Sequence, residues 1–302
     1  MIKKTIYFGN PAYLRKSKNQ LKVEFPEDIS RDSKSIPIED IGILILDSPR
    51  VTITQALLSD LIGNNTAVLC CDQSHLPLGL FMPMASNHIY TEKLRHQLES
   101  TEPLRKNLWQ QTVKAKIKNQ ATVLAKQNVS VKNLLFWEKR VKSGDPDNFE
   151  ARAAAYYWGK FREGEPFRRR RFGEVPNNLL NYGYAVLRAV VARSLVASGM
   201  LPAVGIHHRN KYNPFCLADD IMEPYRPYVD KIVKEICETQ DAEKIEMLSP
   251  EIKQALLVIP QIDVVIEEKK SPLMVAMQRT TASLMQCFEG EKRRILYPEI
   301  SA

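Results

Sequence analysis

Several features are missing from this chain of 302 residues, and each absence argues against one class of protein. No run of about 18 apolar residues occurs, so no membrane span is expected. Basic residues near the N-terminus are not followed by an apolar core, so a secretory signal is not expected. The five cysteines form no Cys-x-x-Cys pair, which argues against a zinc ribbon and favours free thiols in a reducing cytosol.

The composition is that of a globular chain with a basic surplus. Hydrophobic residues make up 44% and charged residues 26%, which is enough to bury a core. A chain of this length is expected to form about two domains. The net charge of +8 and the pI of about 9.1 favour a polyanionic partner such as nucleic acid.

The residue pattern changes near residue 83, and this change predicts two domains. Short runs of β-branched and aromatic residues, separated by turn residues, predict strands at 5–8, 13–15, 21–25, 36–38, 41–46 and 67–71, with one helix at 56–62. Apolar residues at helical spacing then predict helices at 89–98, 104–127, 131–140, 149–161, 177–197, 219–237, 250–257 and 271–288. We therefore predict an α+β protein, with a small β-rich N-terminal domain (1–82) followed by a larger all-helical catalytic domain (83–302).

Residues 205–227 hold an unusual concentration of possible metal ligands. The candidates are His207, His208, Asp219, Asp220 and Glu223. Imidazole combined with carboxylates suits a divalent cation, and the basic residues interspersed among them indicate an anionic substrate, most simply a phosphodiester. The alternative is an ordinary helix start, where acidic residues suit the positive end of the helix dipole. The pattern does not decide which histidine would bind.

A third ligand has to come from elsewhere in the chain, and Glu150 is the candidate. It lies in the first turn of a helix that we expect to be capped by Asp147 or Asn148. Small alanines follow it and allow close helix packing. The alternative is that Glu150 takes part in a capping arrangement with Asp147.

The densest run of positive charge lies between these two segments. It consists of Arg168, Arg169, Arg170 and Arg171, flanked by two phenylalanines. Guanidinium groups bind phosphates in two-pronged fashion, so we predict a nucleic-acid contact, with a solvated loop as the alternative. By contrast, Lys114, Lys116 and Lys118 alternate along a helix, which is typical of a solvated face.

Three motifs together resemble the CRISPR-associated integrase of spacer acquisition, in its short type II form. The first is Glu-Ala-Arg-Ala-Ala-Ala-Tyr-Tyr at 150–157 and the second is Asn-Asn-Leu-Leu-Asn-Tyr-Gly-Tyr at 177–184. The third pairs Gly-Ile-His-His at 205–208 with Asp-Ile-Met-Glu-Pro-Tyr-Arg-Pro at 220–227. The resemblance covers essentially the whole chain. Asn178 and Arg209 depart from the usual residues, and neither is a proposed ligand.

The resemblance implies a site and an activity. Glu150, His208 and Glu223 would be the metal ligands and catalytic residues for Mg²⁺ or Mn²⁺, with Asp220 and Asn177 in supporting roles. The expected reaction is attack by a DNA 3′-hydroxyl on a phosphodiester, which inserts foreign fragments as spacers into a CRISPR array. DNA contacts are expected from Arg209 and Lys211 as well as from the arginine run.

The resemblance also implies partners in the bacterial cytoplasm. These are double-stranded DNA (the foreign fragment and the CRISPR repeat), a second copy of the chain, and a small second adaptation subunit that completes a heterohexamer. The RNA-guided effector nuclease and an accessory adaptation protein are further expected partners. Two other functions remain open at this stage: a stand-alone structure-selective DNA nuclease, and a basic DNA-binding scaffold without catalysis.

Overall fold

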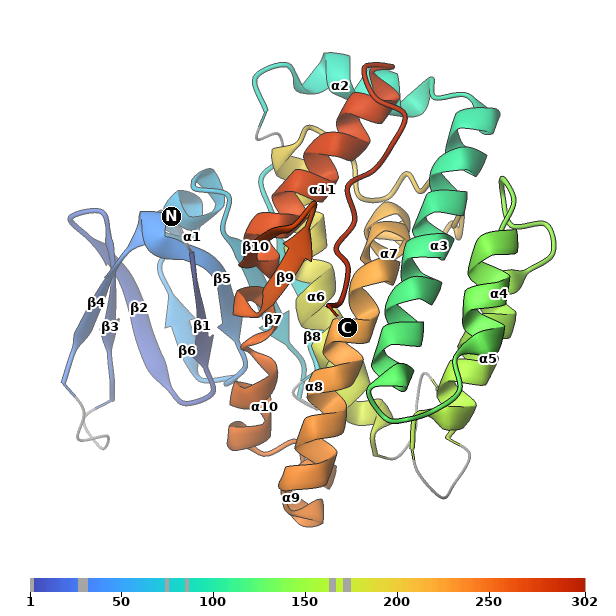
Figure 1. The fold of residues 1–302 in the computed structure, drawn as a ribbon. Helices are drawn as coiled ribbons and strands as arrows, with labels where there is room; N and C mark the ends of the chain where they lie inside the picture. Colours follow the sequence, from blue (N-terminus) through green and yellow to red (C-terminus); the bar gives the residue numbers. More distant parts are fainter. Residues whose placement is uncertain are drawn as a thin grey trace.

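The computed structural model describes residues 3–26, 32–73, 76–84, 87–162, 167–170 and 175–301. Strands gather at one side of the molecule and helices at the other (Figure 1). The predicted α+β class, with the β-rich part first and the helical part second, is confirmed. The boundary at residue 82 stays a prediction, because one hydrophobic core includes residues from both sides of it.

Two four-stranded sheets form the N-terminal part. The strands are β1 (Lys4–Phe8), β2 (Ala12–Ser17), β3 (Gln20–Glu24), β4 (Lys34–Pro37), β5 (Ile41–Leu46), β6 (Val51–Ile53), β7 (Ala67–Cys71) and β8 (Pro77–Phe81). One sheet has the order β1-β5-β7-β8, in which only β8 is antiparallel to its neighbour. The other has the order β4-β3-β2-β6. The 3₁₀ turn η1 (Ile38–Asp40) and helix α1 (Gln55–Gly63) complete this part.

Strand β5 joins the two parts of the molecule. Its residues are almost all buried, as predicted for a strand covered on both faces. Leu44 packs in the core between the two sheets, whereas Ile43 and Ile45 belong to the core shared with the helices. Alternation of side chains along a strand accounts for this division.

A buried ion pair also connects the N-terminal part to the helical part. Asp47 follows β5, and its Oδ2 atom lies 2.9 Å from the Nζ atom of Lys253 in α10 (Pro250–Leu256). Both residues are buried, and the Tyr7 hydroxyl also donates a hydrogen bond to Asp47. The N-terminal part is therefore attached to α10 by charge as well as by apolar contact.

Helix α6 runs through the middle of the helical part (Figure 1). The helices are α2 (Tyr90–Leu98), α3 (Glu102–Ala125), α4 (Lys132–Arg140), α5 (Phe149–Lys160), α6 (Asn177–Ala197), α7 (Cys216–Met222), α8 (Arg226–Thr239), α9 (Ala242–Glu246), α10 and α11 (Leu273–Phe288), with 3₁₀ turns η2 (Glu223–Tyr225) and η3 (Ile259–Gln261). Gly183 lets α6 approach α8 closely, since a Cβ atom there would lie 2.6 Å from Val229 Cγ1.

Two sequence predictions for this part were wrong in detail. The single helix expected at 219–237 is two helices, α7 and α8, joined by η2, because Pro224 cannot donate a helical hydrogen bond. The part is also not all-helical, since β9 (Asp263–Ile266) and β10 (Lys269–Pro272) form an antiparallel hairpin. None of the described helices combines the length and apolarity that a membrane span requires.

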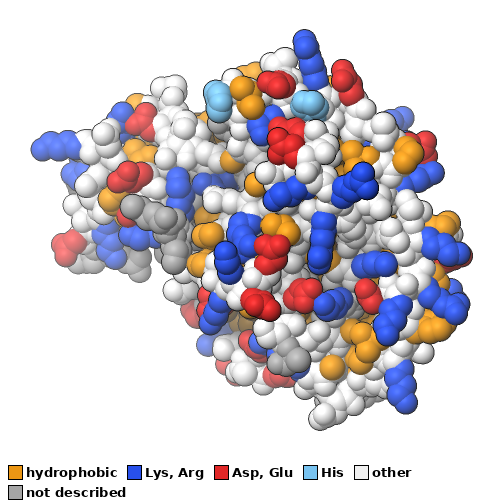
Figure 2. Space-filling view, turned by 45° about the horizontal axis from the view of Figure 1, so that its top comes forward, with side chains coloured by type: hydrophobic (Ala, Val, Ile, Leu, Met, Phe, Trp, Pro, Cys, Tyr) orange, Lys and Arg blue, Asp and Glu red, His pale blue; other side chains and the backbone are white. Residues whose placement is uncertain are grey.

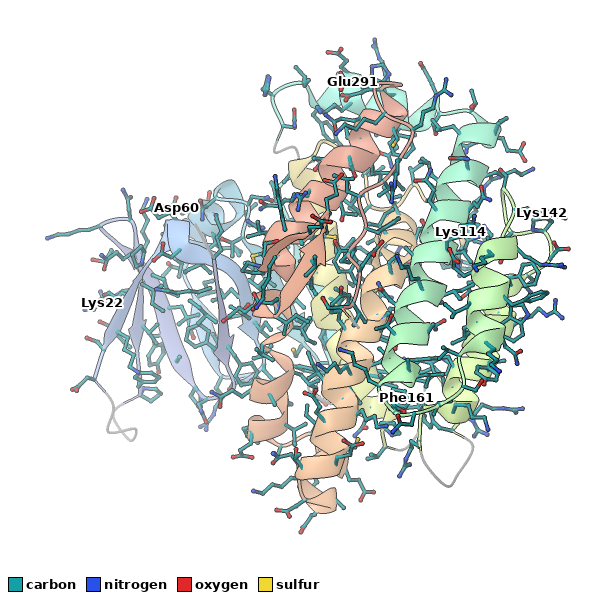
Figure 3. All side chains as sticks on the ribbon, viewed as in Figure 1. Lys22, Asp60, Lys114, Lys142, Phe161 and Glu291 are labelled. Carbon is teal, nitrogen blue, oxygen red and sulfur yellow. The ribbon has the colours of Figure 1, made fainter. Side chains whose placement is uncertain are left out.

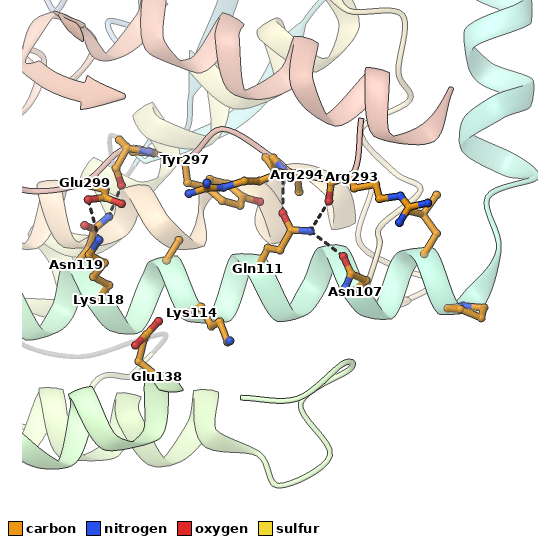
Figure 4. Close-up of a pocket in the computed structure, with 15 residues that line it drawn as sticks. Asn107, Gln111, Lys114, Lys118, Asn119, Glu138, Arg293, Arg294, Tyr297 and Glu299 are labelled. Atoms are coloured by element: carbon orange, nitrogen blue, oxygen red, sulfur yellow. Dashed lines mark hydrogen bonds and ion pairs between the residues drawn. The ribbon is translucent and has the colours of Figure 1, made fainter. Parts of the chain in front are cut away.

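The segment 292–300 runs in extended form along α3 and is held there by two amide side chains (Figure 4). Gln111 donates to Arg293 O and accepts from Ile295 N, each at 2.9 Å. Asn119 donates to Pro298 O at 2.9 Å and accepts from Ile300 N at 3.0 Å. A hollow of about 890 Å³ lies between this segment, α3 and α4.

Candidate metal centre and nucleic-acid interface

Two acidic side chains meet on one lysine inside the helical part. Lys116 lies midway along α3, Glu150 in the first turn of α5, and Glu223 at the start of η2. The Lys116 Nζ atom pairs with Glu150 Oε1 and lies 2.5 Å from Glu223 Oε2. The side chains of Lys116 and Glu223 are each 9% exposed, so solvent screens their attraction weakly. Two carboxylates thus converge on a single positive charge.

A second cation contacts Glu223 from the other side. The Arg226 Nε atom lies 2.8 Å from Glu223 Oε1, so both carboxylate oxygens of Glu223 face positive charge. Burial alone would raise the pKa of Glu223, but Arg226 and Lys116 outweigh it and lower the pKa to about 2. Glu223 is therefore ionised at neutral pH.

Asp220 organises the loop that carries the two histidines. It is fully buried and accepts hydrogen bonds from the backbone N–H groups of His207 (2.9 Å) and His208 (3.3 Å). Its Oδ1 atom also lies 2.5 Å from His208 Nδ1. This bond raises the pKa of His208 against the effect of burial. With Nδ1 held by a carboxylate, the other ring nitrogen, Nε2, is the atom left for a ligand.

His207 has a different environment. Its ring stacks on Trp109 of α3, with 4.0 Å between ring centres and 3° between planes. Burial lowers the pKa of His207, and the neighbouring His208 lowers it further. The carboxylate-held ring is therefore that of His208, whereas His207 packs the loop against α3.

Asp219 also bonds to the histidine loop, but at Asn213 and not at the histidines. Its carboxylate lies 2.7 Å from Arg188 Nε and accepts a bond of 2.7 Å from Asn213 Nδ2. Helix α7 begins at Cys216, so Asp219 lies in its first turn. The acidic helix start considered from the sequence is therefore present for Asp219, and both aspartates are also bonded to groups outside their own helix.

Gly205 is required by close packing around Asp220. A Cβ atom at this position would lie 2.4 Å from His208 O and 2.7 Å from Asp220 Oδ2. Any larger residue would push the histidine loop away from the carboxylate that holds it.

The arginine run lies beside the N-terminal end of α6. Asn177 Oδ1 accepts hydrogen bonds from Arg169 Nη1 (3.0 Å) and from the backbone N–H of Arg170 (2.9 Å). The Arg169 guanidinium is 5.3 Å from the centre of the Tyr184 ring, so it faces α6. Arg168 and Arg170 are exposed, and Arg171 lies outside the described residues.

Tyr184 connects the arginine run to the acidic site. The Arg226 guanidinium lies 4.5 Å from the centre of the same ring that Arg169 approaches. The Tyr184 hydroxyl donates a bond of 2.5 Å to Asp230, which also accepts one of 3.0 Å from Tyr157. Burial raises the pKa of Asp230 to about 7. Arg226 thus contacts both Glu223 and the Tyr184 ring.

Arg209 and Lys211 are exposed on the loop that follows His208. They line a hollow of about 730 Å³ that His208 also borders, and Arg105 contributes to its wall. Tyr212 is 81% exposed at its edge, with Lys211 Nζ 4.8 Å from the ring centre. Surfaces that bind single-stranded nucleic acid combine positive charges with exposed aromatic rings.

Sequence reasoning missed two residues of this site. The prediction that Lys116 belongs to a solvated face was wrong, because Lys116 is buried between Glu150 and Glu223. The predicted cap of α5 was also wrong. Asp145 accepts bonds of 2.9 Å from the backbone N–H groups of Phe149 and Glu150, while Asn148 makes no side-chain cap bond.

The donor chemistry fits a divalent cation. Two ionisable carboxylates converge on one positive charge, beside an imidazole whose second nitrogen is held by a carboxylate. As the side chains stand, the described residues contain no group of three His, Cys, Asp or Glu assembled for an ion. The Lys116 ammonium holds the position between the two carboxylates.

Two known proteins are similar in sequence to this chain over most of its length. The chain is 39% identical to the CRISPR-associated endonuclease Cas1 of Neisseria meningitidis over 89% of this chain and 88% of that one. A second such protein, from Pyrobaculum aerophilum, is 28% identical over 77% of this chain and 82% of its own length.

Solved structures share the fold at low sequence identity. A casposase bound to integration product has a TM-score of 0.80 at 19% identity, covering 98% of this chain and 92% of that one. A CAS1 protein from Thermotoga maritima has a TM-score of 0.76 at 17% identity, covering 96% and 98%. The family model described as CRISPR associated protein Cas1 matches residues 6–256. By this match and its likeness to the Neisseria protein, the chain belongs to the CRISPR-associated Cas1 family.

Proposed function

We propose that this protein is a metal-dependent DNA integrase and endonuclease that inserts short foreign fragments as spacers into a CRISPR array. The observation that supports it most is the convergence of Glu150 and Glu223 on one positive charge, beside the Asp220-bound His208. The name of the Neisseria relative, an endonuclease, and the integration product bound to the casposase support the same activity.

Glu150, His208 and Glu223 would hold one Mg²⁺ or Mn²⁺ ion, which would polarise the scissile phosphate and stabilise the charge that develops on it. Arg226 keeps Glu223 ionised for this purpose. Asp220 holds Nδ1 of the His208 ring, which would leave Nε2 to bind the ion.

The joining step exchanges one phosphodiester for another. The 3′-hydroxyl oxygen of a foreign fragment forms a bond to the phosphorus of a strand at the repeat boundary, and its proton passes to solvent. The bond from that phosphorus to the leaving 3′-oxygen breaks, and this oxygen takes up a proton. Water in place of the attacking hydroxyl turns the same step into cleavage.

The DNA path would follow the exposed cations beside His208. Arg209, Lys211 and Arg105 line the hollow there, and Arg168 and Arg170 are exposed near α6. Basic side chains are spread over the helical part of the surface, with acidic ones among them (Figure 2). Arg169 and Asn177 would support this surface by holding the arginine run in place.

A Lys211→Met protein is expected to bind DNA more weakly, with the slope of log affinity against log salt reduced by about 1, because one phosphate contact is lost. Fluorescence anisotropy at salt concentrations from about 50 to about 300 mM would measure the DNA affinity and its salt dependence. Lys22→Met, in β3 of the N-terminal part (Figure 3), is the matched control and should leave the slope unchanged.

An Asp220→Asn protein is expected to lose about 10–100-fold in Mn²⁺-dependent joining, since the carboxylate that orients His208 loses its charge. Single-turnover joining assays would measure the loss. Asp219→Asn is the control from the adjacent position, because Asp219 bonds Arg188 and Asn213 and not the histidine. Equal losses in the two variants would contradict the role given to Asp220.

Assembly with other chains is part of the proposal. The fold matches a chain of a Cas6-RT-Cas1–Cas2 complex with a TM-score of 0.74 at 20% identity, covering 96% of this chain and 35% of that one. We infer a homodimer, two of which are bridged by a small second adaptation subunit into a heterohexamer. The effector nuclease and the accessory adaptation protein would join that assembly.

The deciding experiment compares the purified protein in EDTA and in Mn²⁺, with and without the second subunit, on labelled DNA ends and a repeat-containing plasmid. The proposal expects joined products only with a divalent ion, and more of them with the partner. Repeated cleavage without joining would indicate a stand-alone nuclease. DNA binding with neither joining nor cleavage in any condition would indicate a scaffold.

A further inference from the structure

We propose that Lys116 and the divalent cation compete for one position, so that Lys116 must leave Glu150 and Glu223 before the cation binds. The Lys116 ammonium would thus act as a built-in counter-ion that holds the two carboxylates close together. This inference rests on the metal site of the proposed function and adds a residue to it.

Three of the carboxylate oxygens of Glu150 and Glu223 already face a positive charge. Glu223 Oε2 and Glu150 Oε1 pair with Lys116, and Glu223 Oε1 pairs with Arg226. A bound Mg²⁺ lies about 2.0–2.1 Å from its oxygen ligands. An ion at that distance from the oxygens that now face Lys116 would overlap the ammonium, which lies 2.5 Å from Glu223 Oε2. The two cations would also repel each other at short range.

Of the two cations on Glu223, Lys116 is the one that can move. Arg226 packs its guanidinium 4.5 Å from the centre of the Tyr184 ring, and Tyr184 is fixed by its bond to Asp230. Lysine carries a compact charge on a flexible four-carbon stem, whereas the arginine fork is rigid. Arg226 is therefore expected to keep its place when Lys116 leaves.

The path for Lys116 leads toward solvent on the Glu150 side. The Glu150 side chain is 28% exposed and that of His208 is 47% exposed, compared with 9% for Glu223. An ammonium that swings past Glu150 therefore regains water and keeps its charge. It then lies at the edge of the site where a DNA phosphate would arrive.

The test is calorimetric titration of Mn²⁺ into the wild type and into Lys116→Met, which keeps the length of the side chain and removes the charge. Removal of the competing charge is expected to tighten Mn²⁺ binding at least about tenfold. Lys114→Met, on the same helix but lining the hollow beside α4 (Figure 4), should bind as the wild type does. Melting temperatures add a second readout: Lys116→Met should melt lower than the wild type in EDTA and gain more from Mn²⁺.

Three results separate the possible failures. If the wild type binds Mn²⁺ and Lys116→Met binds it equally or more weakly, the competition is refuted while the metal site stands. If neither protein binds Mn²⁺, the metal site and the inference fail together. If Glu150→Gln does not bind Mn²⁺ and Lys116→Met binds it more tightly than the wild type, the metal site and the competition are both supported.

A measurement on the wild type covers the case in which Lys116→Met does not fold. Reductive methylation followed by mass spectrometry reports how accessible each lysine is. Addition of Mn²⁺ should increase the labelling of Lys116 and leave that of Lys114 unchanged. Labelling of Lys116 that does not respond to Mn²⁺ would refute the displacement.

Discussion

A Glu223→Gln protein is expected to join DNA ends at least about a thousandfold more slowly than the wild type. Glutamine keeps the shape of the side chain but removes the charge that would bind the cation. Loss of about 4 kcal/mol of transition-state stabilisation corresponds to a rate reduction on the order of a thousandfold. Single-turnover joining in saturating Mn²⁺ is the measurement.

The matched control is Glu299→Gln. Glu299 also pairs with a lysine of α3, Lys118, but its side chain is 57% exposed and it lies away from the histidine loop. Its joining rate should stay within about twofold of the wild type, since exposed pairs contribute little. A Glu223→Gln protein that joins within tenfold of the wild-type rate, on the order of 1.4 kcal/mol, would remove Glu223 from the ligand set.

The largest effect on stability is expected from Lys253→Met. This change removes the positive charge that lies 2.9 Å from the buried Asp47 carboxylate, at a cost of about 3–5 kcal/mol. For a chain of this size the melting temperature should fall by roughly 6–10 °C. Differential scanning calorimetry in EDTA would measure this without interference from metal binding.

The double variant Asp47→Asn with Lys253→Met shows whether charge is the cause. An asparagine can still accept the hydrogen bond from the Tyr7 hydroxyl, and it carries no negative charge. Much of the lost melting temperature should return in the double variant. A double variant as unstable as Lys253→Met alone would point to lost packing at α10 as the cause.

The sequence pointed to individual polar residues, and it did not predict the side chains that surround them. The family resemblance implied Glu150, His208 and Glu223 as a set, and the structure places Asp220 on His208 Nδ1. Lys116 was assigned to the solvated surface because its neighbours in helical pattern are Lys114 and Lys118. Its burial depends on α5 and η2, which are distant in sequence, so no local pattern contains it.

The same distinction applies to the fold. Strand β5 and helix α6 have long apolar patterns, and both were predicted with the bounds that the structure shows. The hairpin β9–β10 was missed because each strand has only four residues, and Ser271 was assigned to the helix that follows. Short strands are formed by pairing with each other, and pairing is not visible in the sequence of either one alone.

The extended segment along α3 has a consequence for the order of folding. Asn119 forms hydrogen bonds with residues 298 and 300, about 180 positions later in the chain. During synthesis α3 therefore emerges long before the residues that satisfy this amide, and closing so long a loop costs entropy before the contacts form. The helical part is expected to remain an incomplete intermediate until residues 293–300 have emerged from the ribosome, as is common in chains of this size.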